Sequence, residues 1–114
     1  MIVCTSEDRA SSLVALQVLV VSLARHCPDI DVHACVPAAT DDFLHWADRH
    51  PTLRLLPHRA EWPTGWNIKP TLLANRLAAG HDEVVWLDTD IAVTRDFRPS
   101  WPTDDTLVVA EEWD

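Results

Sequence analysis

The sequence predicts an α/β fold, in which a mainly parallel sheet is flanked by helices. Short apolar segments alternate with longer segments of helical periodicity, and no repeat or Gly- or Ser-rich linker interrupts that alternation. Strands that are separated by helices form parallel crossover units. We therefore expect one domain that spans residues 1–114.

The N-terminal third predicts a strand, a helix and a second strand. Residues 2–5 form a short strand-like run that is followed by turn and capping residues. Residues 11–26 are apolar on nearly every side of a helix, so we expect this helix to be buried. Residues 31–36 alternate apolar and polar side chains and end at Pro37, which is typical of a strand.

The middle of the chain predicts a helix, a short strand and an irregular loop. Thr40 is a preferred N-cap residue for a helix over residues 41–50, whose apolar side chains share one face. Residues 53–56 form a short strand. Residues 57–66 contain two prolines, a glycine and two tryptophans without any period, and we expect a loop there.

The C-terminal third predicts a helix and two apolar strands. The helix over residues 68–79 has Pro70 in its first turn and Gly80 as its terminator. Residues 83–87 and 106–110 are strongly apolar runs, which we interpret as the fourth and fifth strands. Parallel sheets of this kind bind ligands at the carboxyl ends of their strands.

The formal net charge of −9 limits the classes of ligand. Proteins that bind nucleic acids neutralise phosphates with clustered Lys and Arg, whereas this chain has a single lysine, Lys69, and scattered arginines. We therefore expect no nucleic-acid partner. An acidic protein that binds a phosphorylated ligand needs another source of positive charge, which is usually a divalent cation held by carboxylates.

The cysteines and histidines show no metal-ligand spacing. We expect Cys4, Cys27 and Cys35 to be small buried side chains in a reducing compartment, although a bridge between Cys27 and Cys35 is left open. We expect the six histidines to lie at the surface or at helix ends. The apolar run over residues 11–24 lacks a basic leader and is too short to span a bilayer, so we expect no transmembrane segment and a cytoplasmic location.

Asp88-Thr89-Asp90 directly follows the fourth predicted strand. In extended backbone, residues two apart point the same way at a spacing of about 6–7 Å, and Trp86 shares this side. Carboxylate pairs suit Mn²⁺ or Mg²⁺ and leave positions open for phosphate oxygens. The competing interpretation is that the tripeptide only turns the chain after a strand, which is a common use of Asp.

The segment Trp66-Asn67-Ile68-Lys69-Pro70-Thr71-Leu72-Leu73 precedes Val84-Val85-Trp86-Leu87-Asp88-Thr89-Asp90 by one helix. This arrangement resembles the GT-A glycosyltransferases, which have a Rossmann-like nucleotide-sugar-binding half, and especially the relatives of glycogenin and of the bacterial lipopolysaccharide galactosyl- and glucosyltransferases. In those enzymes a Lys-bearing helix leads into a strand of the form apolar-apolar-x-Leu-Asp-x-Asp. The resemblance covers the whole chain loosely and residues 66–97 closely.

The resemblance implies metal-dependent transfer of a sugar from a nucleoside diphosphate-sugar to a hydroxyl acceptor, with Mn²⁺ or Mg²⁺ as the cofactor. Asp90 would then be the main metal ligand, and Asp88 would contact the ribose or share the metal. Lys69 would lie near the sugar or the phosphates as a catalytic residue. Thr5 and Ser6 would line the pocket for the base and the ribose.

Two other interpretations stay open. In the resembled family a third metal ligand, usually His, and the acceptor-binding part lie in a C-terminal half that has no counterpart here. We therefore expect a truncated N-terminal half of such an enzyme. The first alternative is a non-catalytic nucleotide-binding or assembly fragment, and a homo-oligomer is one such assembly. A haloacid-dehalogenase-like phosphatase would use Asp88 as the nucleophile and Asp90 as the general acid. That family has its motif on the first strand and Thr or Val where Ala92 lies.

Overall fold

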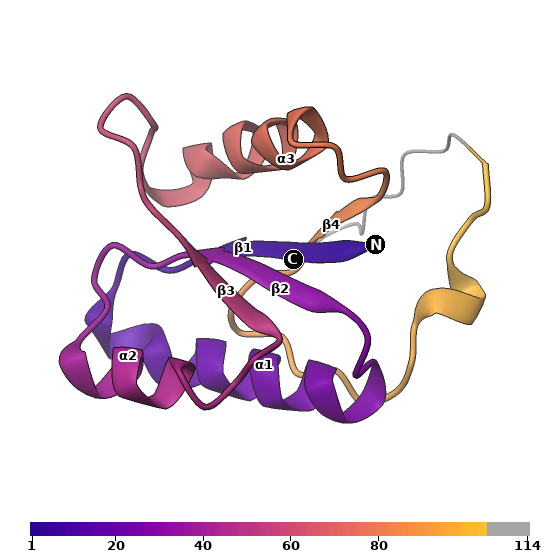
Figure 1. Ribbon diagram of the computed structural model, residues 1–114, viewed down its shortest axis with the longest axis horizontal. Helices are drawn as coiled ribbons and strands as arrows, with labels where there is room; N and C mark the ends of the chain where they lie inside the picture. The colour runs from indigo at the N-terminus through magenta and orange to yellow at the C-terminus, as the bar shows by residue number, and fades with distance from the viewer. Residues whose placement is uncertain (105–114) are drawn as a thin grey trace, which may run out of the picture.

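The structure is a computed structural model that describes residues 1–104 of the chain, so the strand predicted over residues 106–110 lies outside the described residues. It contains one parallel sheet of four strands in the order β3-β2-β1-β4, as Figure 1 shows. The strands are β1 (Ile2–Ser6), β2 (Asp31–Cys35), β3 (Leu53–Leu56) and β4 (Val84–Trp86). The predicted α/β fold with a parallel sheet is confirmed.

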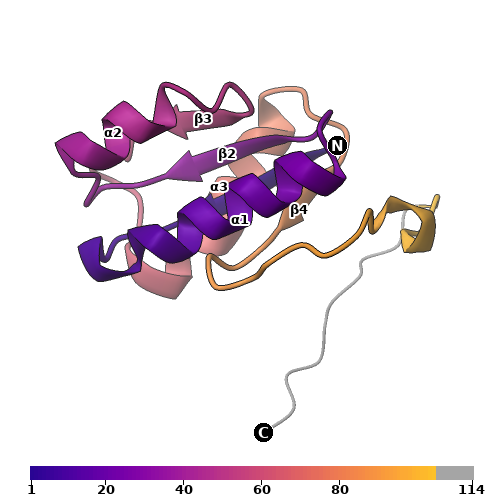
Figure 2. The same ribbon diagram turned by 90° about the horizontal axis from the view of Figure 1, so that it is seen from below.

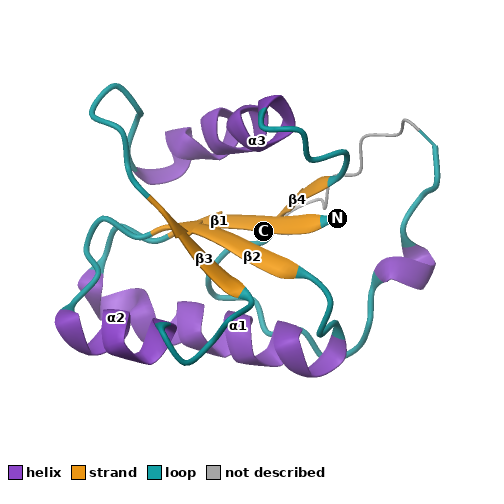
Figure 3. Cartoon of the chain, viewed as in Figure 1, coloured by secondary structure: helices purple, strands orange, loops and turns teal. Residues whose placement is uncertain are grey.

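Helices cover both faces of the sheet. Helices α1 (Leu13–His26) and α2 (Asp41–Ala47) lie on one face and α3 (Ile68–Ala78) lies on the other, which Figures 1 and 3 show from the side and Figure 2 from below. Alternate residues of β1 supply the two cores, since Val3 packs with the α1 and α2 cluster and Cys4 packs with the α3 cluster. This arrangement explains why the strands read as apolar runs.

The ends of the helices follow the expected signals. The Thr40 hydroxyl accepts a hydrogen bond of 3.2 Å from the backbone N–H of Phe43, which caps α2. Helix α3 begins at Ile68, with Pro70 in its first turn, and Gly80 follows it with a φ of +99°. Both helices are slightly shorter than predicted. The loop before α3 contains a short 3-10 turn over Gly65–Asn67.

The prediction that the helix over residues 11–26 is buried was wrong for its outer face. Leu16, Leu19 and Leu23 are fully buried against the sheet, but Val14 is 68% exposed and Val18 and Val21 are each 48% exposed. A helix that lies on a sheet can bury only one side, whatever the composition of the other side. The exposed valines line an apolar groove of about 550 Å³ beside residues 93–94.

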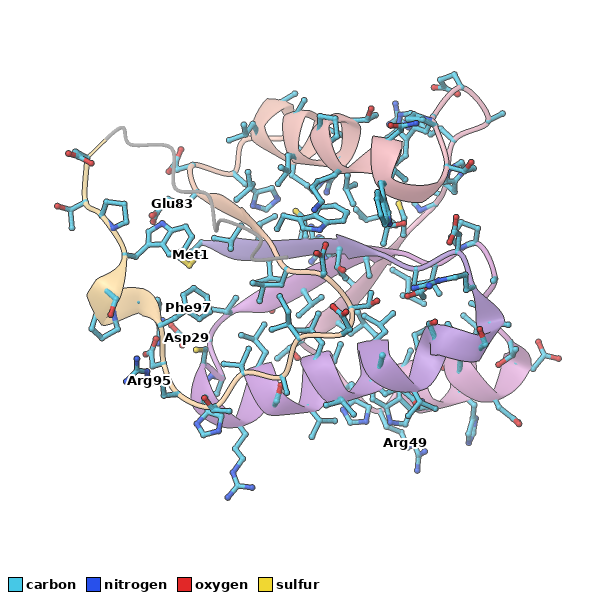
Figure 4. The ribbon with its side chains drawn as sticks, turned by 180° about the vertical axis from the view of Figure 1, so that it is seen from behind. Met1, Asp29, Arg49, Glu83, Arg95 and Phe97 are labelled. Carbon is cyan, nitrogen blue, oxygen red and sulfur yellow. The ribbon has the colours of Figure 1, made fainter. Side chains whose placement is uncertain are left out.

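The segment after β4 crosses the C-terminal end of α1. The backbone N–H of Val93 donates to the Ser22 hydroxyl at 2.9 Å. Farther along, the Arg98 guanidinium pairs with Asp96 at 2.7 Å and with Asp29. Figure 4 shows the labelled Asp29 and Phe97 at this end of α1. Within residues 1–104, no helix combines the length and the apolarity needed to cross a membrane.

The three cysteines are free and buried, as predicted. Burial is the main cause that raises the pKa of the Cys4 thiol to about 11, which keeps this thiol protonated at neutral pH. Burial also raises the pKa of Cys35 above its usual value. These residues therefore serve as packing groups and have little thiolate character.

One histidine departs from the prediction of surface positions. His33 lies in the middle of β2 and is 1% exposed. Its Nδ1 atom is 3.4 Å from a guanidinium nitrogen of Arg76, and its ring makes an edge contact with His81 at a centroid distance of 5.0 Å. The sequence alternation placed His33 on the second face of β2, and helix α3 covers that face.

Burial of His33 should make the protein less stable in mild acid. Burial first, and then the charges of His81, Arg54 and Arg76, lower the pKa of His33 to about 4. Between about pH 6.5 and pH 4 the unfolded chain therefore binds a proton at this position that the folded chain does not bind. The free energy of unfolding should fall by roughly 1 kcal/mol per pH unit as the pH drops through this window. Urea unfolding from pH 7 to pH 5 measures this slope.

The variant His33→Gln should flatten the slope, since glutamine does not titrate. The pKa of Glu7 also lies below its usual value, but this carboxyl adds an acid-dependent loss only below about pH 4.5. Measurements above pH 5 separate the two groups. A slope that His33→Gln leaves unchanged would contradict the assignment.

Candidate functional site

A polar pocket of about 490 Å³ lies at the carboxyl ends of β1 and β4. Three segments that are far apart in the sequence form it: the loop after β1, the turn that leads into α3, and the loop after β4. Its lining residues are Ser6, Glu7, Asp8, Arg9, Gly65, Trp66, Lys69, Trp86, Asp88, Thr89 and Asp90. The pocket thus lies at the edge of the sheet where the sequence analysis predicted a ligand site.

Lys69, Trp86 and Asp88 form one contact group in this pocket. Oδ1 of Asp88 accepts a hydrogen bond of 2.6 Å from Nε1 of Trp86 and lies 3.2 Å from Nζ of Lys69. The Lys69 ammonium is also 5.3 Å from the centre of the Trp86 ring, within the range of a cation–π contact. The side chains of Lys69 and Asp88 are 43% and 58% exposed, so a ligand can reach both.

The Asp-Thr-Asp segment differs in shape from the prediction. Strand β4 ends at Trp86, and the backbone N–H of Ile91 donates to the carbonyl of Asp88 at 3.1 Å, so the segment turns after Asp88. The regular alternation expected of extended backbone therefore stops before Asp90. Thr89 is buried at 7% exposure, whereas Asp88 and Asp90 on either side are exposed to the pocket.

A buried carboxylate, which the sequence analysis missed, joins the loops after β1 and β4. Oε2 of Glu7 accepts a hydrogen bond of 2.6 Å from the Thr89 hydroxyl, and Oε1 accepts from Nε of Arg9 at 3.0 Å. Burial tends to raise the pKa of Glu7, but the hydrogen bonds from Arg9 and Thr89 outweigh it and lower this pKa below its usual value. The one sequence signal that pointed to Glu7 was its position after the first strand.

A second contact joins the loop before α3 to the loop after β1. The backbone N–H of Gly65 donates to Oδ2 of Asp8 at 3.1 Å, and Gly65 has a φ of +61°, a conformation that favours glycine. This contact holds the loop before α3 next to the loop after β1. The adjacent Trp66 is 95% exposed and lines the pocket. Its indole ring is thus available for contact with a flat ligand.

The structure brings four of the five predicted site residues together. Ser6, Lys69, Asp88 and Asp90 all line this pocket. Thr5 does not, because its side chain is fully buried and its hydroxyl has no hydrogen-bond partner within residues 1–104. The roles of these residues in binding stay predictions.

The pocket has more acidic than basic side chains. Four carboxylates and two cationic side chains line it, which gives a formal charge of −2 at neutral pH. Within residues 1–104, no cluster of three or more His, Cys, Asp or Glu side chains could hold a metal ion. The exposed Asp88 and Asp90 carboxylates fit a hard divalent ion that takes its other ligands from phosphate oxygens and water.

The sheet with helices on both faces is a Rossmann-like α/β arrangement, and the pocket lies at the carboxyl ends of its strands. No protein-family model matches the chain, and no curated protein matches its sequence. Solved structures match its fold. The galactosyltransferase LgtC in complex with donor and acceptor sugar analogues has a TM-score of 0.62 and 20% identity, over 91% of this chain and 43% of that chain.

A second similar structure is S. aureus TarS 1-349 in complex with UDP-GlcNAc. Its TM-score is 0.55 and its identity is 17%, over 78% of this chain and 26% of that one. A longer S. aureus TarS structure gives a TM-score of 0.58 at 21% identity, over 87% of this chain and 18% of that one. The chain therefore has the fold of less than half of each of these glycosyltransferases.

The fold also bears on the phosphatase alternative. The Asp-Thr-Asp segment follows β4, which is the last of the four strands in the described chain and lies at the edge of the sheet. A haloacid-dehalogenase-like enzyme would carry this motif after its first strand. The position of the motif after β4 therefore argues against a haloacid-dehalogenase-like phosphatase.

Proposed function

We propose that the pocket binds the nucleoside diphosphate part of a sugar donor together with Mn²⁺ or Mg²⁺. One observation carries the proposal: Nζ of Lys69 lies 3.2 Å from Oδ1 of Asp88, and both residues line the same pocket as Asp90. Helix α3 supplies Lys69, and the segment after β4 supplies Asp88 and Asp90. An anion site made of one flexible cation and an exposed carboxylate pair is typical of metal-bridged diphosphate binding.

The charge balance supports a requirement for a cation. A nucleoside diphosphate is strongly anionic, and a pocket of formal charge −2 repels it. A divalent ion between Asp90 and the diphosphate would turn that repulsion into attraction, and it would offset charge on the departing diphosphate. Asp88 would share this ion or accept a hydrogen bond from a ribose hydroxyl.

Lys69, Trp66 and Ser6 have further roles in this proposal. Lys69 would exchange its contact with Asp88 for a phosphate or sugar oxygen when the donor binds. The exposed Trp66 ring would stack on the base or the sugar, with Ser6 beside the ribose. Thr5 would support the pocket from behind, because its side chain is buried.

The reaction proposed for the whole enzyme is transfer of the sugar to a hydroxyl acceptor. The neighbours support this chemistry, because LgtC is described with donor and acceptor sugar analogues and TarS with UDP-GlcNAc. The described residues contribute the donor side of such a reaction. The acceptor side would come from residues other than 1–104 or from a partner in an assembly.

Titration of the intrinsic tryptophan fluorescence tests the proposal. We expect one of UDP, GDP and ADP to change the emission saturably in the presence of Mn²⁺, with affinity at least about tenfold weaker when Mn²⁺ is chelated. Trp66 and Trp86 line the pocket and should report binding. Trp66→Phe should remove most of the signal, whereas calorimetry should still detect binding.

A titration without nucleotide binding would overturn the proposal. A folded protein that binds none of the three nucleotides, with or without Mn²⁺, would reduce Asp88-Thr89-Asp90 to a turn after a strand. The chain would then be better interpreted as a non-catalytic part of an assembly. Binding of a nucleotide without any effect of Mn²⁺ would keep the pocket but remove the metal from the proposal.

A further inference from the structure

Glu7 has no role in the proposed binding of the donor, yet it is one of the most constrained side chains of the pocket. Its residue is 3% exposed, although charged carboxylates are rarely buried without partners. Its backbone N–H donates to the carbonyl of Cys35 at 3.0 Å, which fixes the main chain at the end of β1 against β2. The carboxylate therefore starts from a rigid position in the sheet.

Both oxygens of this carboxylate have partners. Oε1 accepts from the backbone N–H of Arg9 at 3.1 Å and from its Nε at 3.0 Å. Oε2 accepts from the Thr89 hydroxyl at 2.6 Å and from a terminal guanidinium nitrogen of Arg9 at 3.3 Å. Arg9 thus supplies the counter-charge that a buried carboxylate needs. The shortest of the four hydrogen bonds to this carboxylate is the one from the Thr89 hydroxyl.

Thr89 is the middle residue of the Asp-Thr-Asp segment. Strand β4 ends at Trp86, and the backbone N–H of Leu87 donates to the carbonyl of Cys4 at 3.2 Å, one residue before the segment begins. The Thr89 hydroxyl donates to Glu7, and Thr89 is only 7% exposed. With the middle residue held inside, Asp88 and Asp90 on either side lie at the surface of the pocket.

We propose that Glu7 is a positioning residue, which holds Thr89 through a hydrogen bond and thereby fixes the Asp88 and Asp90 carboxylates in the geometry that binds the metal. The inference rests on the proposed function, because it explains how the same metal ligands are held in position. In this proposal Glu7 acts through Thr89 and not as a metal ligand. Outer partners of this kind typically contribute ten- to a hundredfold to metal affinity.

The experiment compares Thr89→Val with Thr89→Ser in the full chain. Valine matches threonine in shape but lacks the hydroxyl, whereas serine keeps the hydroxyl. We expect Thr89→Val to weaken Mn²⁺ binding, measured in the presence of saturating nucleotide, by about tenfold or more. Thr89→Ser should restore the affinity to within about threefold of the wild type, since its hydroxyl can bond Glu7.

Two readouts separate positioning from a general effect on stability. The Mn²⁺ electron paramagnetic resonance spectrum of the complex should broaden or change its splitting in Thr89→Val, because the ligands become less ordered, and should return in Thr89→Ser. Thr94→Val is a matched control at an exposed position outside the pocket, and it should leave the Mn²⁺ affinity unchanged. Circular dichroism confirms that each variant is folded at the temperature of the measurement.

The outcomes distinguish this inference from the function on which it rests. If the wild type binds nucleotide with Mn²⁺ and folded Thr89→Val binds Mn²⁺ equally well, the positioning role is overturned and the proposed function stands. If Thr89→Val fails to fold, a Thr89→Ser affinity more than tenfold below the wild type also overturns the role. A wild type that binds no nucleotide overturns both.

Discussion

Replacing Asp90 with asparagine is expected to abolish Mn²⁺-dependent nucleotide binding while it leaves the fold intact. Asparagine keeps the size of the side chain but removes the negative charge that holds a hard cation. Asp90 is exposed at the pocket, so the change should not disturb the core. Because loss of an outer partner already weakens metal sites by ten- to a hundredfold, loss of a direct ligand should cost on the order of a hundredfold or more. That ratio corresponds to about 3 kcal/mol of binding free energy.

Calorimetric titration with nucleotide and Mn²⁺ measures this loss. Asp82→Asn is the matched control, since Asp82 is an exposed aspartate that does not line the pocket. The control should bind like the wild type, and both variants should have its far-ultraviolet circular dichroism spectrum. An Asp90→Asn protein with unchanged affinity would contradict the proposed role of Asp90 as a metal ligand.

The second large effect concerns the core under α1. Leu19→Ala should lower the free energy of unfolding by about 2–5 kcal/mol, because Leu19 is fully buried between α1 and the sheet. Domains of this size have a total stability of about 5–15 kcal/mol, so the variant would lose a large share of it. Urea unfolding should show a lower midpoint with an unchanged slope.

Val18→Ala, one residue away on the same helix, provides the comparison. Val18 is 48% exposed, and its truncation should change the free energy of unfolding by no more than about 0.5 kcal/mol. Similar losses in the two variants would mean that the outer face of α1 is covered in solution.

The sequence was a good guide to the elements of this fold. The alternation of strands and helices, the Thr40 cap and the Gly80 terminator are all local signals, and each is confirmed. The exposed face of α1 was not predictable in the same way. The pattern of Val14, Val18 and Val21 shows that these residues are apolar, but exposure depends on what packs against them from elsewhere in the chain.

In the site, too, local sequence signals were predictive and contacts between distant segments were not. Asp88 and Asp90 were predicted from residue types and spacing within one segment, and Lys69 was predicted from the resemblance of residues 66–97 to the GT-A glycosyltransferases. All three line one pocket. Glu7 was missed because its importance comes from a partner 82 positions away, Thr89, which no local pattern connects to it. The resemblance placed Thr5 in the pocket, whereas the alternation along β1 turns its side chain into the protein interior.

The parallel pairing of β1 with β4 has a consequence for the kinetics of folding. Ile2 pairs with Val84, so this edge of the sheet forms only when a loop of about 80 residues closes. Helices form early from local contacts, whereas pairings between distant segments form slowly. Glu7 meets Thr89 across the same closure. The pocket is therefore absent from any intermediate in which β4 has not yet docked, and ligand binding reports completion of the sheet.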